Sequence, residues 1–233
     1  MLLLEIDINK GTYDIEHIIA VCDQTNQYWL FNNLLVSKVN EQPEDAKQLL
    51  DKYRYVIDKD PMLFLMYVQL TYSIEGKETA QSLFVEYEEK YGSYLEYWIT
   101  KLRRFYSEEE LNEVVKKWLN SECGHLSNSG NLDFISLLME HHKYSDALQG
   151  ILQVENSQGL GAEYLRLKAI ALFNTKHEIE ALEAFNQLFE KFIQSDETVF
   201  YIIMLSVNNK RAVSASVMEH GKKSENPEVL LVT

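Results

Sequence analysis

The chain has 233 residues, 46% of them hydrophobic and 25% charged, which is typical of one or two folded domains and excludes wholesale disorder. With only 9 glycines and 3 prolines, it lacks the breakers that an all-β chain with many tight turns needs. Its 22 basic and 36 acidic residues give a net charge of −14, opposite in sign to that of a nonspecific nucleic-acid binder.

The first residues carry no targeting signal. They read Met-Leu-Leu-Leu-Glu-Ile-Asp-Ile, without a basic region and with acids interrupting the apolar run after four residues, so they are not a secretory signal. No stretch approaches the roughly 18 apolar residues of a membrane-spanning helix. We therefore expect a cytoplasmic protein with reduced thiols and no membrane insertion. Both ends are apolar, the second at residues 229–232, which leaves two interpretations open: a piece of a longer protein, or ends that dock on a neighbour.

Apolar residues at helical spacing predict a series of helix pairs along the chain. Residues 1–26 form a partial unit with its turn at residues 11–14. A polar, glycine-containing stretch at residues 120–131 predicts a flexible break between residues 1–120 and 131–233. The first helices of the pairs are expected over residues 27–39, 63–72, 95–106, 132–141, 162–173 and 198–207.

Alanines recur at a fixed period where the second helices begin. The spacing is 34 residues from Ala46 to Ala80, from Ala147 to Ala181, and from Ala181 to a weaker match at Ala215. The middle gap of 67 residues is one short of two periods. A large apolar residue follows each of the first four alanines by four positions, namely Leu50, Phe84, Ile151 and Phe185.

A 34-residue helix–turn–helix period with this small and large pair resembles the tetratricopeptide repeat. Tyr144, three residues before Ala147, matches the turn aromatic of that family. The alanines frame units near residues 27–60, 61–94, 95–127, 128–161, 162–195 and 196–229, the third of them degenerate. The family's Leu-Gly pair in the first helix is replaced by Asn33-Leu34, Tyr67-Val68, Phe134-Ile135 and Lys168-Ala169, so that helix should pack less tightly.

The resemblance implies an all-α, right-handed solenoid of about six to seven antiparallel helical hairpins, forming a single domain over residues 1–233. Other helical-hairpin arrays are the alternative. In the family the first helix of each unit lines a concave groove that holds ligands. The corresponding positions here are Tyr28, Phe31, Asn32, Leu35, Met62, Leu65, Met66, Gln69, Tyr72, Ile99, Arg103, Tyr106, Glu163, Arg166, Leu167, Ile170, Phe173, Phe200, Tyr201 and Met204.

This predicted groove is aromatic, apolar and rich in methionine, a composition that suits an amphipathic helix or an apolar segment of a partner. Some members of the family clamp a peptide carboxylate with Lys and Asn, but those positions hold Phe31, Leu35, Leu65 and Gln69 here. The clamp is therefore absent. The alternative is that the predicted groove residues are core, buried by tight coiling of the superhelix.

Other chemistry has weaker support in the sequence. A basic cluster lies near aromatic residues that could stack a nucleic-acid base, and it consists of Lys101, Arg103, Arg104, Lys116 and Lys117. Four glutamates between residues 108 and 113 cancel the positive potential of this cluster. The sequence has two clusters of residues that could bind a metal, namely Cys123 with His125, and His141 with His142. Cys22 is the other cysteine and lies far from both in the sequence. These residues lack the spacing of a zinc site or a catalytic triad. We expect no enzyme, no cofactor and no nucleic-acid partner.

The sequence therefore predicts a non-enzymatic scaffold or adaptor that binds a peptide or helical segment of a partner, with a preference for apolar or basic partners. One alternative is a regulator that senses a short signalling peptide. Another is a structural subunit that docks through its apolar ends, as a homo-oligomer or in a larger complex.

Overall fold

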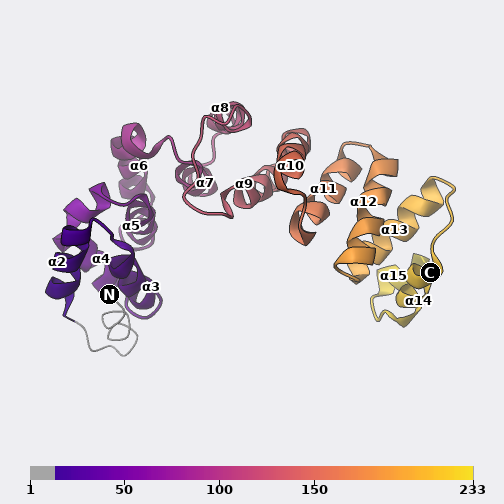
Figure 1. Ribbon diagram of the computed structural model, residues 1–233, viewed down its shortest axis with the longest axis horizontal. Helices are drawn as coiled ribbons and strands as arrows, with labels where there is room; N and C mark the ends of the chain where they lie inside the picture. The colour runs from indigo at the N-terminus through magenta and orange to yellow at the C-terminus, as the bar shows by residue number, and fades with distance from the viewer. Residues whose placement is uncertain (1–13, 233) are drawn as a thin grey trace. The chain divides into compact units, whose positions relative to one another are not determined.

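The computed structural model describes residues 14–232, and within them the chain is built from α-helices, one 3-10 helix and an isolated bridge between Tyr94 and Gly124 (Figure 1). The all-α prediction is confirmed for this part of the chain. Consecutive helices pack on one another from α2 to α6 and from α9 to α15. Their bounds are α2 Ile15–Thr25, α3 Trp29–Glu41, α4 Pro43–Lys52, η1 Arg54–Asp58, α5 Pro61–Ile74, α6 Lys77–Tyr91, α7 Leu95–Arg104, α8 Glu108–Leu119, α9 Gly130–Glu140, α10 Tyr144–Gln158, α11 Ala162–Asn174, α12 Glu178–Lys191, α13 Asp196–Asn208, α14 Ala215–Lys223 and α15 Pro227–Val232.

Short polar side chains and prolines set where several helices begin. The Asp60 carboxylate accepts hydrogen bonds from the first backbone N–H groups of α5, the nearer at 2.7 Å, and Pro61 has no N–H to satisfy. Ser195 and Ser214 cap α13 and α14 in the same way. Asp14 caps α2, while the rest of the turn predicted at residues 11–14 lies outside the described residues.

The turns inside three helix pairs repeat at the predicted period. His142, Lys176 and Lys210, each 34 residues from the next, adopt left-handed backbone angles with φ of 57°, 67° and 52°. Each turn also places the following N–H on a carbonyl five residues back, as from Lys143 to Leu138 at 2.8 Å. This hydrogen bond satisfies a carbonyl that the end of the first helix leaves open. The 34-residue period is therefore present in the backbone as well as in the sequence.

The periodic alanines lie where the second helices contact the first. A side chain that ends at Cβ lets two helix backbones approach closely. Ala215, at the start of α14, is exposed and makes no such contact. The other four periodic alanines have no exposed surface, and they are Ala46, Ala80, Ala147 and Ala181. The large residues four positions later are also buried, and they are Leu50, Phe84, Ile151 and Phe185.

The chain forms two compact units. Unit 1 comprises the chain up to Val114 together with Ser121–Ser127, and unit 2 comprises Val115–Asn120 and the chain from Asn128 onward. Helix α8 therefore contributes residues to both units. The flexible break predicted near residues 120–131 stays a prediction.

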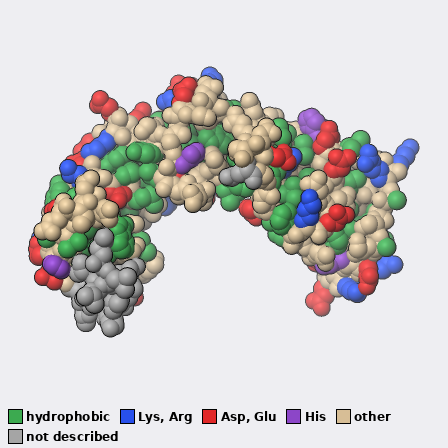
Figure 2. Space-filling view, viewed as in Figure 1, with side chains coloured by type: hydrophobic (Ala, Val, Ile, Leu, Met, Phe, Trp, Pro, Cys, Tyr) green, Lys and Arg blue, Asp and Glu red, His purple; other side chains and the backbone are tan. Residues whose placement is uncertain are grey.

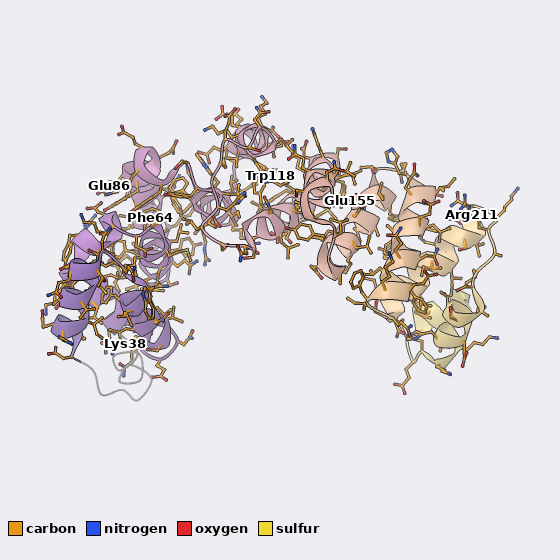
Figure 3. The ribbon with its side chains drawn as sticks, in the orientation of Figure 1. Lys38, Phe64, Glu86, Trp118, Glu155 and Arg211 are labelled. Carbon is orange, nitrogen blue, oxygen red and sulfur yellow. The ribbon has the colours of Figure 1, made fainter. Side chains whose placement is uncertain are left out.

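Aromatic rings dominate the core of unit 1. Phe64 of α5 is fully buried, and Figure 3 shows its side chain among the helices of this unit. Its ring lies edge-on to Phe84 at 5.9 Å between centroids and tilts against Tyr87 and Tyr91 at 4.8 and 5.1 Å. Such pairs add to the free energy of burial because the edge of one ring faces the electron-rich face of another.

Three charged side chains in the described part of unit 1 are buried, and two of them, Lys47 and Glu96, hold neighbouring segments together. Lys47 of α4 contacts Asp51 at 3.0 Å and Glu75 at 2.6 Å, which ties α4 to the end of α5. Glu96 of α7 accepts hydrogen bonds from the backbone N–H groups of Leu126 and Ser127, both at 2.9 Å. These two hydrogen bonds hold the segment 121–127 on the first turn of α7, beside the bridge between Tyr94 and Gly124.

Unit 2 contains a close helix contact that depends on one glycine. The ring of Trp118, in the last turn of α8, lies against Gly150 of α10. If residue 150 had a Cβ, that atom would lie only 1.8 Å from Cη2 of the Trp118 ring. The indole Nε1 donates to Asn131 Oδ1 at 2.7 Å, and the ring meets Phe134 edge-on at 4.9 Å. Gly150 thus provides the space that a fixed tryptophan ring occupies.

Candidate interaction surfaces

The predicted groove positions of α3 lie in the core. Phe31 and Leu35 have no exposed surface, since α2 and α4 pack on α3 and cover them. Tyr28 is buried and donates its hydroxyl to Asp23 Oδ1 at 2.8 Å. Asn32 is half-buried. Phe31 and Leu35 therefore offer no surface to a partner, which corrects the expectation that they line a groove.

Residues of α5 divide between core and surface. Leu65 is buried, which corrects its assignment to the groove, whereas Met62 is exposed and Met66 half-buried. Gln69 is exposed, and Tyr72 is half-buried at the end of the helix. A helical period shows that a helix has an apolar face, but it does not show how much of that face neighbouring helices cover.

One hollow of about 350 Å³ lies between α5 and α7 in unit 1. The structure brings together here three predicted residues, Gln69, Ile99 and Arg103, with Arg104. The Arg104 guanidinium lies over the ring of Tyr72, with 4.8 Å from Cζ to the ring centroid. Sequence reasoning placed Arg104 in a basic cluster and not in the groove, because only packing shows that it shares the hollow. Within the described part of the chain, the hollow is lined by Gln69, Ile99, Thr100, Arg103 and Arg104.

A second surface is the face that α11 and α13 share in unit 2. On α11, Ile170 and Phe173 stand three residues apart, and on α13 Met204 stands three residues after Tyr201 and four after Phe200, so these side chains lie close together. Phe173 meets Tyr201 edge-on at 5.3 Å, and Tyr201 stacks on Phe185 at 4.7 Å. Val207, one turn beyond Met204 on α13, is 66% exposed. The half-buried apolar residues of this face are Ile170, Phe173, Phe200, Tyr201 and Met204.

Charged residues stand at one end of this apolar face. Arg166 of α11 lies between Glu163 at 3.4 Å and Glu197 of α13 at 3.5 Å. Burial raises the pKa of Tyr201, and the negative charge of Glu197 raises it further. The predicted residues Arg166, Phe173 and Tyr201 therefore occupy one continuous surface.

Of the aromatic residues near the basic cluster of α7 and α8, the two tryptophans are buried, whereas Tyr106 is 47% exposed. Lys101 is buried, contacts Glu88 at 3.1 Å and Glu110 at 2.9 Å, and lies over the ring of Trp98. Trp98 is only 5% exposed and donates its Nε1 to a backbone carbonyl at 2.7 Å. In unit 2, Trp118 is also 5% exposed. Buried rings offer no face to a base.

The residues weighed as ligands are dispersed. Cys22 and Cys123 are free thiols, both buried, and burial raises the pKa of Cys22. Within the described part of the chain, no group of three or more His, Cys, Asp or Glu side chains is arranged to hold a metal ion. A polar hollow of about 480 Å³ in unit 2 includes His142 and His177, whose ring nitrogens contact Tyr144 at 2.7 Å and Thr175 at 3.0 Å.

The apolar carboxyl-terminal residues lie partly in the core of unit 2. Val229 of α15 has no exposed surface and belongs to the main apolar cluster of this unit, while Leu230 is 50% exposed. The apolar residues at the other end of the chain lie outside the described residues. No helix within residues 14–232 is long and apolar enough to cross a membrane.

Comparison with known proteins assigns no family to the chain. No protein-family model matches it, and no curated protein is detectably similar to it in sequence.

Proposed function

We propose that the chain is a right-handed, tetratricopeptide-like solenoid of six to seven helical hairpins and acts as a non-enzymatic scaffold in the cytoplasm. The 34-residue period of buried alanines and left-handed turns supports the architecture. Repeat units of this kind bury their apolar faces against neighbours and leave an extended surface for partners. The step from repeat to binding rests on analogy with the family, since fold alone does not define function.

The observation that carries the binding role is the apolar face of α11 and α13. Its aromatic and methionine side chains are only half-buried by unit 2, and Val207 extends the row into solvent. A methionine-containing apolar face suits a partner helix, because flexible side chains adapt to its shape. Trp29 and most other exposed apolar residues stand singly in the sequence and do not need such an explanation, whereas Phe192 and Ile193 are an adjacent exposed pair at the end of α12.

Charge indicates the chemistry of the occupant. The chain carries −14 net charge, and in the view of Figure 2 acidic side chains are spread over both units. Glu163 and Glu197 stand at the end of the apolar face. Long-range attraction then favours a partner segment that combines apolar side chains with Lys or Arg.

A photo-cross-linking residue in place of Val207 tests this proposal. Val85 of α6 provides the matched control, because it is also a valine, is 73% exposed, and lies on the second helix of its pair. We expect the Val207 position to cross-link, in native extract, to one recurring segment with apolar and basic residues. The Val85 position should not capture that segment.

Three results would overturn the scaffold proposal. They are equal capture of the same segment at both positions, capture of segments without shared chemistry, and no capture at Val207. Cross-linking of Val207 to a second copy of this chain would instead establish a homo-oligomer that forms through this face.

A further inference from the structure

The segment 121–127 belongs to unit 1, although the chain on either side of it belongs to unit 2. The segment contains no helix, and two backbone hydrogen bonds join its Gly124 to the start of α7. The Gly124 N–H donates to the carbonyl of Ser93 at 2.8 Å, and the Leu95 N–H donates to the carbonyl of Gly124 at 2.9 Å. Further along the segment, the attachment to α7 comes from the side chain of Glu96.

The hydrogen bonds on Glu96 are divided unevenly between its two carboxylate oxygens. Oε1 accepts bonds from the N–H groups of Leu126 and Ser127, both at 2.9 Å, and from the Ser127 hydroxyl at 3.1 Å. Oε2 is buried and has no hydrogen-bond partner in the described part of the chain. A carboxylate oxygen offers about two lone pairs, so the hydroxyl is a surplus third donor on an oxygen that the backbone already satisfies.

The charge of Glu96 lies where water screens it poorly. The residue is only 9% exposed, and it stands in the first turn of α7, where the helix dipole favours a negative charge. A second negative charge placed against this carboxylate meets strong Coulomb repulsion, because the local dielectric constant is low. The contact is therefore sensitive to any charge added to the segment at this point.

The hydroxyl that meets this carboxylate belongs to an accessible residue. Ser127 is exposed, and it lies in the irregular stretch between α8 and α9, where no helix holds its backbone. Ser121, at the other end of the segment, is also exposed, but within the described part of the chain its hydroxyl does not bond to Glu96. Position 127 thus combines access for a modifying enzyme with contact to a buried charge.

We propose that Ser127 is a phosphorylation site and that a phosphate there releases the segment 121–127 from α7. A serine kinase transfers the γ-phosphoryl group of ATP to the Ser127 Oγ, which loses its proton, and ADP is the second product. The phosphate carries a charge of about −1.5 to −2 at pH 7 and takes the place of a hydroxyl that contacts Glu96. Repulsion then separates the carboxylate from the neighbouring N–H groups, and Cys123, buried in the segment, becomes accessible.

Peptide mass spectrometry tests the site. The full chain, incubated in native extract with ATP, should carry phosphate at Ser127, and the Ser127→Ala chain should lack it. Ser127→Ala keeps both backbone donors to Glu96, so its segment should stay attached. Phosphate confined to other serines, or no phosphate on the chain, overturns the assignment of the site.

The full chain synthesised with phosphoserine at position 127 tests the release, with maleimide labelling of the two cysteines as the readout. Cys123 is 7% exposed, whereas Cys22 has no exposed surface and reports opening of the rest of unit 1. We expect Cys123 to react at least about ten-fold faster, with Cys22 unchanged and faster hydrogen exchange at Leu126 and Ser127. Phosphoserine at position 121 is the matched control and should leave both labelling rates unchanged.

Glu96→Gln separates the effect of charge from that of size. The amide retains an oxygen that can accept the two N–H bonds, but it has no negative charge. In this background, phosphoserine at position 127 should accelerate the labelling of Cys123 by less than about three-fold, because the repulsion is gone.

The release mechanism fails if phosphoserine at positions 127 and 121 has the same effect, or if labelling of Cys123 does not change. Reaction of Cys22 together with Cys123 contradicts a local release, and an equal effect in the Glu96→Gln chain contradicts repulsion as its cause. These measurements concern unit 1 and do not depend on the cross-linking at Val207, so this inference and the proposed function can fail separately.

Discussion

Replacing Gly150 by alanine should destabilise unit 2, although the same change in an ordinary helix interior stabilises by about 1 kcal/mol. The added Cβ would lie 1.8 Å from Cη2 of the Trp118 ring and 2.5 Å from Cζ3, far inside normal contact. The ring cannot move aside without cost, because its Nε1 is bonded to Asn131 and its edge rests on Phe134.

The magnitude follows from these contacts. Overpacking of a filled core typically costs about 1–3 kcal/mol. Displacing the indole also weakens a hydrogen bond worth about 1 kcal/mol. The alanine's higher helix propensity offsets part of these costs, so the free energy of unfolding should fall by about 2 kcal/mol. In a unit of this size, that corresponds to a fall of roughly 10 °C in the midpoint of thermal unfolding.

The assay is thermal and urea unfolding, followed by ellipticity and tryptophan fluorescence, with hydrogen exchange of α10 as the local readout. Trp118→Leu removes the ring edge and provides the second background. In that background Gly150→Ala should become neutral or stabilising, so that the two substitutions couple by about 2 kcal/mol. Stabilisation by Gly150→Ala in the unmodified chain, or the same effect in both backgrounds, would refute the reasoning.

Three further predictions concern the polar contacts of unit 1. Lys47→Met should lower the free energy of unfolding by about 1–2 kcal/mol in urea titrations. The loss should be smaller than for a fully buried ion pair, because the partner side chains of Asp51 and Glu75 are 47% and 40% exposed and regain contact with water. Burial and the hydrogen bond to Asp23 raise the pKa of Tyr28 to about 12. The free energy of unfolding should therefore be retained below about pH 10 and fall as pH rises toward 12. Tyr28→Phe should reduce this fall with pH, and an unchanged fall would contradict the assignment of the pH dependence to Tyr28. Glu96→Ala should accelerate hydrogen exchange in the segment 121–127, while equal protection in both proteins would show that the carboxylate does not hold it.

The positions of the helix pairs could be predicted because they depend on local patterns. The unit frame near residues 61–94 corresponds to α5 and α6, and the frame near 162–195 to α11 and α12. Alanine and a large apolar residue four positions later identify the face of the second helix that meets the first. That signal is absent at Ala215, which follows the period in sequence but is exposed in the structure.

The surfaces could be predicted only in part. The register that placed Phe31 and Leu35 in a groove correctly found an apolar face, but neighbouring helices cover it. Arg104 entered the hollow because α7 packs beside α5, which no spacing along the chain shows. The space at Gly150 was likewise not predictable, because the ring that fills it lies 32 positions earlier in the sequence.

The path of the chain through the two units has a practical consequence. The chain leaves unit 1 after Val114, returns to it at Ser121, and leaves again after Ser127, so no single cut yields both units whole. A fragment that ends at residue 120 takes Trp118 away from α10 and leaves Glu96 without the segment whose N–H groups it accepts. Fragments for separate study of the two units would both need to include residues 115–127. Unit 1 would then keep residues 121–127, and unit 2 would keep residues 115–120.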